Sequence, residues 1–365
     1  MKTILIAHNY TEVSFSAMSY SLANHLASLG YQVVFISHQP YFIKEQFIHK
    51  DNGKIIVCSW PTTKRPTSLS DFLWYCKIYL KYKPEVVIGH FVGSNITILA
   101  SKLLSFGRVK TFEYYHTLRS QLFIDMKRVT LRQKLLFLRK KIFYKLYCDI
   151  IVCPSELAKK DLESFYGNEK GVVLLNPMMD RFIDRKVLIK DSIIVSYLGR
   201  LDPSKGIIDL IEAYKVYKER VVNSKITLRV AGTGSQVVKI QKLVKNNPGI
   251  EYLGTLQYDA IDDYLSGSNF TIIPSKFDNL PTVGLESMMN QTPLLISNTT
   301  GLADYLTDGK ECFKFEPNLD SIVSLFDKIE NNFNLYEQMS FDARATYLDK
   351  FSMDTYCNTF YQAIL

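Results

Sequence analysis

The residue pattern in the first half of the chain predicts strands that alternate with helices. Each candidate strand is a short, continuously apolar run, and apolar residues recur at helical spacing between most of them. Strands that are apolar on both faces and separated by helices indicate a parallel sheet covered on both sides. The predicted strands are 3–8, 32–37, 54–58, 85–89, 109–114, 149–153 and 171–175, and the predicted helices are 15–29, 68–82, 94–105, 119–147 and 155–165.

The same alternation restarts after residue 190, and the predicted linker consists of Asn176-Pro177 and the mixed-charge stretch at 180–191. We therefore predict an α/β protein with two doubly wound, Rossmann-like domains, 1–178 and 179–350. Their facing carboxyl strand ends would border a cleft. Residues 351–365 form a predicted terminal helix. The second set of strands is 192–198, 225–231, 250–253, 269–273, 293–297 and 312–315, with helices near 205–219, 235–246, 258–265, 281–290 and 318–331.

Composition narrows the class of protein without identifying it. The 365 residues are 47% hydrophobic and 22% charged, a globular balance that excludes disordered and fibrous classes. No apolar stretch approaches the roughly 18 residues that a membrane helix needs, and the apolar start is too short for a signal peptide. Six scattered cysteines without a CxxC pair argue against zinc or disulfides, so we expect a cytoplasmic chain.

The net charge of +8 is uneven, because residues 1–178 carry +12 and the remainder −4. No acid lies between Asp125 and Asp149, where apolar positions 131, 135, 138 and 142 predict a basic amphipathic helix. The helix either packs its apolar side on the core and solvates its basic side, or contacts an anionic membrane. Nucleic acid binding lacks a recognition motif. The cations of this region include Lys127, Arg128, Arg132, Lys134, Arg139, Lys140, Lys141 and Lys145.

Two loops of the second half follow a strand and open a helix. In Gly199–Gly206, Gly199 allows a close backbone approach, while Arg200 and Lys205 offer two positive charges that suit a diphosphate. A surface loop with two solvated cations fits the same residues. In Ala231-Gly232-Thr233-Gly234, a helix N-terminus can help to hold an anion, although a tight turn explains the glycines equally well.

The segment 273–286 is the most specific of the chain. A strand ends near Ile273, and Pro281 is placed for the first turn of a helix. Asp278 and Glu286 stand eight residues apart, one in the loop and one in the helix, with free backbone N–H groups between them. The loop can thus offer a carboxylate to a sugar, amides to a phosphate and a second carboxylate to a ribose. Alternatively, both acids are ordinary surface residues.

Together these motifs resemble the large retaining glycosyltransferase family 4 of GT-B fold, whose members use sugar nucleotides. The resemblance covers GR-x4-KG at Gly199–Gly206, the glycines at 231–234 and D-x7-E at 278–286. Downstream, Gly301-Leu302-Ala303-Asp304-Tyr305 and Asp308-Gly309 match as well. In the first half it holds at 21–33, at His116 and at 148–157 with Asn176-Pro177, and Phe351-Ser352-Met353 resembles a last helix that crosses back to the first domain.

The resemblance implies roles for the matching residues. Arg200 and Lys205 would bind the nucleotide diphosphate, and Glu286 would hold the ribose hydroxyls. Asp278 would contact the donor sugar, and His116 would lie on the opposite wall near the sugar and the acceptor. The implied catalytic residues are thus His116, Arg200, Lys205 and Asp278, and further donor-binding residues are Gly199, Gly232, Asn279, Leu280, Thr282, Val283 and Glu286.

Two departures from the family pattern stand out. The family usually has Glu where Asp278 stands, and Asp is one methylene shorter, so the contact to the donor sugar shifts. The family also commonly has Gly-Gly after the first strand, where this chain has Val13-Ser14. Side chains there crowd a backbone approach to phosphate. Ser14 or Ser16 would then supply a hydroxyl to a phosphate or to the acceptor.

The resemblance further implies a front-face transfer in which the departing phosphate takes the acceptor's proton. Positioning and charge stabilisation then come from the protein. The chain has no DxD, and we expect neither a metal nor another cofactor. We expect a nucleotide-sugar donor, with a lean to UDP-sugars, and no nucleic acid partner. A saccharide or polyprenyl-diphosphate-linked acceptor would meet the basic first domain peripherally at the inner membrane face, in capsule, O-antigen or exopolysaccharide synthesis.

Other classes of function stay open at this point. One alternative is a non-catalytic sugar-nucleotide-binding partner of another transferase, which the Val13-Ser14 change would permit. Another is a GT-B sugar-nucleotide epimerase, although its acid–base residues are not evident. A dinucleotide oxidoreductase is disfavoured because Val237 stands where the GxGxxG fingerprint needs its last glycine.

Overall fold

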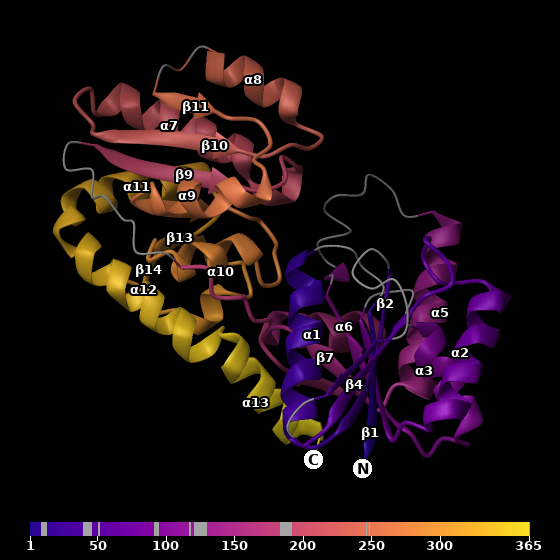
Figure 1. Cartoon of the computed structure of the whole chain (residues 1–365). Coiled ribbons are helices and arrows are strands. Elements are labelled where there is room, and N and C mark those ends of the chain that lie inside the picture. Colours follow the sequence, from indigo (N-terminus) through magenta and orange to yellow (C-terminus); the bar gives the residue numbers. More distant parts are fainter. Residues whose placement is uncertain are drawn as a thin grey trace.

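The protein is described by a computed structural model that covers residues 1–8, 13–38, 46–49, 52–90, 95–116, 118–119, 130–182, 192–245, 247 and 249–364, with backbone only at 13–17 and 46–49. Two separate sheets form the cores of two domains, joined by long helices along one side (Figure 1). The predicted α/β architecture of two parallel sheets is thus present.

The first sheet has eight strands in the order β3-β4-β2-β1-β5-β6-β7-β8, and only β3 runs antiparallel to its neighbour. Strand residues alternate between its two faces, as at Ile4 and Leu5, so each face has its own apolar core. The strands are β1 (Thr3–His8), β2 (Gln32–Ser37), β3 (Gln46–His49), β4 (Lys54–Ser59), β5 (Val86–His90), β6 (Lys110–Tyr114), β7 (Ile150–Cys153) and β8 (Gly171–Val173).

Helices cover both faces of this sheet. Residues of α2, α3, α5 and α6 pack on one face, while α1 and the last helix, α13, pack on the other. Local sequence fixes several helix starts: Ser68 and Asp71 form a capping box at α2, as do Thr130 and Gln133 at α5. The helices are α1 (Val13–Ser28), α2 (Leu69–Tyr82), α3 (Asn95–Leu104), α5 (Leu131–Tyr147) and α6 (Glu156–Tyr166).

The second sheet is entirely parallel, in the order β11-β10-β9-β12-β13-β14. Strand order reverses between β9 and β12, which in such sheets marks the point where ligands bind. The strands are β9 (Ile193–Leu198), β10 (Ile226–Ala231), β11 (Ile250–Tyr252), β12 (Phe270–Ile273), β13 (Leu294–Ser297) and β14 (Cys312–Phe315), and the helices are α7 (Ile207–Arg220), α8 (Val237–Lys245), α9 (Ile261–Ser266), α10 (Thr282–Met289) and α11 (Leu319–Asn331), with short 3-10 turns at Pro203–Lys205, Tyr258–Ala260, Ala303–Tyr305 and Phe333–Leu335.

The chain passes between the domains twice, at positions that are bonded to each other. Met178 N donates to Phe351 O at 2.9 Å, and Met178 also forms a parallel bridge with Ser352. Helix α12 (Tyr336–Lys350) lies along the second domain, and α13 (Met353–Ile364) continues onto the first (Figure 1). Tyr356, Cys357 and Phe360 of α13 are buried in the core of the first sheet.

Two elements differ from the sequence expectations. The helix predicted over 119–147 includes α5, which begins at Leu131, and residues 120–129 lie outside the described part. Pro281 does not occupy the first turn of α10: it caps that helix, with φ −63° and ψ 117°, and Thr282 is the first helical residue.

All six cysteines are free thiols.

Candidate active site

A cation–carboxylate pair lies at the carboxyl edge of the second sheet. Lys205 Nζ donates to Asp278 Oδ2 at 2.5 Å, and both side chains are largely buried. Asp278 Oδ1 also accepts from the backbone N–H of Asn279 at 3.0 Å. Lys205 follows β9 and Asp278 follows β12, the strands at which the strand order reverses. The structure therefore joins two of the predicted catalytic residues.

Close backbone packing holds these two loops together. Gly206 has φ +68°, and a Cβ there would lie 2.0 Å from Pro274 O. Lys276 N donates to Ser204 O at 2.8 Å, which ties the same two loops together a second time. A glycine is required at position 206 because any side chain would separate the loops. Gly206, the second glycine of the GR-x4-KG segment, thus positions Lys205 beside Asp278.

The first domain meets the second through Asn279. Its Nδ2 donates to the carbonyl oxygen of His116 at 3.3 Å, and its Oδ1 accepts from Ser155 Oγ at 2.5 Å. Ser155 also caps α6 by accepting from Ala158 N at 3.0 Å. A predicted donor-binding residue of the second domain therefore contacts the predicted catalytic histidine of the first. The two sequence motifs, far apart in the chain, meet at one place.

Glu286 lies on the inner side of α10 and is only 7% exposed. Burial raises the pKa of its carboxyl to about 7, against the opposing effect of the nearby Arg181 guanidinium. Arg181 Nη2 donates to Glu286 Oε1 at 3.4 Å, and the guanidinium also forms a two-pronged pair with Asp262 at 2.8 and 3.0 Å. The carboxyl is thus poised between its charged and neutral forms at neutral pH.

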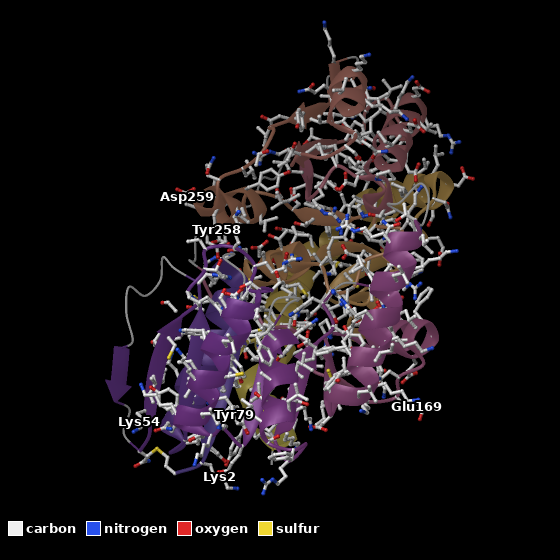
Figure 2. The ribbon with its side chains drawn as sticks, turned by 90° about the vertical axis from the view of Figure 1, so that its right-hand side faces the viewer. Lys2, Lys54, Tyr79, Glu169, Tyr258 and Asp259 are labelled. Atoms are coloured by element: carbon white, nitrogen blue, oxygen red, sulfur yellow. The ribbon has the colours of Figure 1, made fainter. Side chains whose placement is uncertain are left out.

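Arg181 and Asp262 were not anticipated from the sequence. Arg181 lies within the predicted linker, and no spacing rule connects it with α9 or α10. Its guanidinium also lies 5.0 Å from the centroid of the Tyr258 ring. Tyr258 stands on the part of the second domain that faces the first, whereas Lys2 and Lys54 lie at the far end of the first domain (Figure 2).

His116 belongs to a buried cluster of aromatic rings at the carboxyl edge of the first sheet. Its ring is stacked on Tyr114, with centroids 5.2 Å apart, and on His90 at 6.1 Å. His8, at the end of β1, lies 5.9 Å from His90. Burial, together with the neighbouring His8 and Lys140, lowers the pKa of His116 to about 3. His116 is therefore a neutral imidazole at physiological pH.

His8 and His90 were also missed by the sequence reasoning, although a signal for them existed. Each is the last residue of a buried strand, and neighbouring parallel strands end at the same edge of a sheet. Burial and the nearby His8 and His116 lower the pKa of His90 well below its usual value. A histidine at the end of a predicted central strand is thus worth noting as a candidate site residue.

Unlike the largely buried Lys205, Arg200 is exposed to solvent, and Gly232 is packed against the backbone of Gly199. Arg200 Nη1 donates to Asp202 Oδ2 at 2.8 Å, and its side chain is 58% exposed. Gly232 has φ +136°, and a Cβ there would lie 1.8 Å from Gly199 O. Both glycines therefore serve the contact between the two loops. Roles for Arg200, Gly199 and Gly232 in donor binding stay predictions.

The start of α10 supplies the other predicted donor contacts. Leu280 is buried, while Thr282 and Val283 form the first turn of the helix. The N–H groups of a first turn have no helical carbonyl partner and point toward an anion placed there. Side chains of Ser14 and Ser16 lie outside the described part of the structure, as do Lys127 and Arg128.

Helix α5 contradicts one of the two alternatives that its sequence left open, namely that its apolar positions pack on the core. Leu131, Leu135, Leu138 and Ile142 are exposed, and Tyr144 is the buried residue of the helix. Lys140, predicted to face a membrane, instead lies over the rings of Tyr115 and Tyr144 at 5.3 and 5.2 Å from their centroids. The helix packs through a cation and aromatic rings, so its leucines are left outside. The cations that do face solvent include Arg132, Arg139 and Lys141.

Within the described ranges, no three His, Cys, Asp or Glu residues are grouped so that they would hold a metal ion. Of the helices that the structure describes, none combines the length and the apolar character needed to cross a bilayer.

Two α/β sheets whose carboxyl edges meet at the Lys205–Asp278 site have the GT-B architecture of glycosyltransferases. The chain belongs to glycosyltransferase family 4 (glycosyl transferases group 1), a family of transferase enzymes. Residues 17–178 match the model described as Glycosyltransferase Family 4, and residues 178–346 match that of Glycosyl transferases group 1. The predicted family is therefore confirmed.

Solved structures confirm the GT-B fold over the whole chain. Sucrose-phosphate synthase from Thermosynechococcus elongatus matches 100% of this chain and 98% of its own, with a TM-score of 0.74 and 15% identity. The Anabaena protein HepE, solved in complex with UDP, matches 100% and 99%, with a TM-score of 0.72 and 12% identity. Similarity at these identities is a similarity of fold.

Relatives by sequence include glycosyltransferases from archaea and bacteria. An uncharacterized glycosyltransferase of Methanocaldococcus jannaschii is 27% identical over 60% of this chain and 57% of its own length. The capsular polysaccharide biosynthesis glycosyltransferase CapM of Staphylococcus aureus is 24% identical over 60% and 61%. The chain thus spans about three-fifths of the length of these two relatives. A Haemophilus influenzae glycosyltransferase is 23% identical over 90% and 89%.

Proposed function

We propose that the protein transfers a sugar from a UDP-sugar to a hydroxyl group of a saccharide acceptor. The observation that carries this proposal is the Lys205–Asp278 pair, held against His116 by Asn279, on the same segment of the chain as the buried Glu286. Lys205 and Arg200 suit the donor diphosphate, and Glu286 suits the ribose hydroxyls. Asp278 would then face the transferred sugar. HepE has been solved with UDP and with UDP-glucose, which supports the choice of donor.

The proposed transfer retains the configuration of the sugar's anomeric carbon. The bond from this carbon to the diphosphate oxygen breaks, and a bond to the acceptor oxygen forms on the same face. The acceptor's proton passes to an oxygen of the departing diphosphate. Lys205 and Arg200 stabilise the charge that develops there, which makes a metal unnecessary in this proposal. His116, neutral because of its lowered pKa, offers a hydrogen bond to the sugar without attracting the diphosphate.

The proposed acceptor is a saccharide carried on a polyprenyl diphosphate at a membrane, in the assembly of a cell-surface polysaccharide. The charge of +12 on residues 1–178 supports an anionic acceptor at the first domain. The name of CapM, which links that relative to capsular polysaccharide biosynthesis, supports the setting.

The first test is ligand-induced thermal stabilisation by UDP, GDP, ADP, CMP and their sugars. A ligand at about 100 times its dissociation constant stabilises a protein by roughly 2.7 kcal/mol, which raises the melting temperature measurably. We expect UDP and UDP-sugars to raise the melting temperature, and we expect the Glu286→Ala substitution to abolish this increase. Stabilisation by another nucleotide instead of UDP would mean that the donor sugar is carried on that nucleotide. Binding without transfer to any acceptor would favour a non-catalytic, sugar-nucleotide-binding partner.

A further inference from the structure

Helix α5 presents a continuous apolar stripe to the outside of the molecule. Its members follow each other at intervals of three or four residues, which places them on one side of a helix. Each is between 46% and 74% exposed, far more than a residue that packs against its own domain. The stripe consists of Leu131, Leu135, Leu138, Ile142 and Leu146.

The opposite side of α5 attaches the helix to the first domain. Tyr144 is buried there, edge-to-face with Tyr115 at 6.2 Å and Tyr166 at 5.3 Å. Lys140 Nζ lies within 5.9 Å of the centroids of the same three rings. This anchoring needs none of the stripe residues. Their hydrophobicity is therefore available for a contact outside the domain.

Positive charges border the stripe on both sides. At about 3.6 residues per turn, Arg132 and Arg139 fall along one border, while Lys134, Lys141 and Lys145 fall along the other. No acidic residue occurs between Asp125 and Asp149 to balance them. The complementary surface is therefore apolar in its centre and anionic around it. A bilayer containing anionic lipids has this composition at the level of its headgroups.

We propose that α5 lies in the headgroup region of an anionic membrane, with its stripe inserted among the acyl chains. A second copy of this chain is a poorer occupant, because a symmetric pair of stripes would bring the cations of both copies together. Membrane binding by α5 does not require the proposed sugar transfer. It deepens that proposal by bringing the domain that carries His116 close to a lipid-linked acceptor.

The stripe and its borders make separable contributions to binding. Attraction between the cations and anionic headgroups weakens with salt, since charges are screened over about 10 Å at 0.1 M salt. Insertion of the leucines does not depend on salt in this way. Wild-type protein should thus bind anionic vesicles tightly at low salt and retain part of this binding at 1 M salt.

The test is flotation of the full chain with vesicles of phosphatidylglycerol and phosphatidylcholine, compared with vesicles of phosphatidylcholine alone. Leu135→Gln with Leu138→Gln should lower the partition coefficient on anionic vesicles by about tenfold or more. Glutamine keeps a high helix propensity, so circular dichroism should stay unchanged. The matched control is Phe341→Gln with Leu348→Gln on α12, at residues that are 55% and 46% exposed. This control should bind vesicles like the wild type.

A second variant, Arg139→Gln with Lys141→Gln, tests the contribution of the cations. It should bind anionic vesicles more weakly than the wild type at low salt and equally at 1 M salt. Equal partitioning of the wild type and the leucine variant would overturn the proposal. So would a wild-type dimer in sedimentation that the leucine variant loses, because the stripe would then be an interface between copies.

The failure of this inference is distinguishable from failure of the proposed function. Vesicle binding without stabilisation by any nucleotide or nucleotide sugar would leave the membrane inference standing and remove the sugar transfer. Transfer to a short, lipid-free saccharide should proceed equally in wild type and leucine variant. Transfer without any vesicle binding would leave the sugar transfer standing and remove the role of α5.

Discussion

Burial distinguishes Asp278 and Glu286 from ordinary surface acids. They are 9% and 7% exposed, so the alternative that both are solvated residues is excluded. Their spacing in the sequence predicted one acid in a loop and one in a helix, which the structure shows. Sequence spacing did not predict the partners Arg181 and Asp262, because these approach Glu286 through the folding of separate segments.

The raised pKa of Glu286 predicts a pH-dependent donor site. An ionised carboxylate accepts hydrogen bonds from both ribose hydroxyls, whereas the neutral acid accepts less well. With a pKa of about 7, the ionised fraction is about tenfold larger at pH 8 than at pH 6, so UDP-glucose affinity should rise by up to about tenfold. Calorimetric titration at both pH values measures it. Glu286→Gln should bind weakly and equally at both.

The stability of the ligand-free protein should change with pH in the opposite sense. The folded state holds the Glu286 proton more tightly than the unfolded state, whose carboxyl has a pKa near 4.5. Stability from this residue should therefore fall as pH rises from about 4.5 to 7, and then level off. Urea unfolding of wild type and Glu286→Gln across this range should diverge in slope. Parallel curves would refute the raised pKa.

Lys205 and Lys276 provide a matched pair of lysines. Both pair with an aspartate, Lys205 with the buried Asp278 and Lys276 with the half-buried Asp209 at 2.7 Å. Lys205→Ala should lower the rate of sugar transfer by about 10²- to 10³-fold, the usual effect of losing one charge-stabilising donor. Lys276→Ala should leave the rate within about twofold, because solvent screens its pair. Equal losses would contradict the role proposed for Lys205.

At the scale of elements, the predicted parallel strands of both sheets were found, because continuous apolar runs are their direct signature. The four-residue edge strand β3 was missed, since a short antiparallel edge strand carries little pattern. Helix α12 was missed because its buried side includes Ser340 and Ala343. Helix α5 has the predicted period, but the sequence left open whether its apolar side faces the core, because periodicity shows that a helix has two sides and not which side is covered.

Gly232 and Gly254, which follow strands, allow the cost of a close backbone contact to be compared with the cost of a positive φ alone. Gly232→Ala should destabilise the protein by about 3 kcal/mol or more, because its methyl group would overlap Gly199 O at 1.8 Å. Gly254 has φ +68° with nothing within 4 Å, so Gly254→Ala should cost only about 1 kcal/mol. Thermal and urea unfolding would rank them. The reverse order would show that the loops can separate without loss.

At the scale of the molecule, the last helix belongs to the core of the first domain. Phe360 of α13 is fully buried, and the centroid of its ring lies 5.5 Å from that of Phe112 and 6.2 Å from that of Tyr114. Tyr114 in turn stacks on His116, and its hydroxyl is hydrogen-bonded to that of Tyr356 on α13. The candidate site is therefore supported by the last helix, through Tyr114.

Phe360→Ala should destabilise the first domain by about 3–5 kcal/mol, the usual range for a buried phenylalanine. Hydrogen exchange should accelerate in α1 and β6, and much less in β9 and β10. Phe341→Ala, at an exposed position of α12, serves as the control and should change neither. Uniformly faster exchange in both sheets would mean that the domains unfold as one unit.

The crossing of α13 also has a consequence for the newly made chain. Synthesis delivers the strands of the first sheet early, yet one face of that sheet is completed by residues 353–364, which follow the whole second domain. The domain that leaves the ribosome first is thus the last to be finished. Until then Ile4, Ile6 and Phe112 lack part of their cover, and this face is a surface on which a nascent chain can aggregate or bind a chaperone.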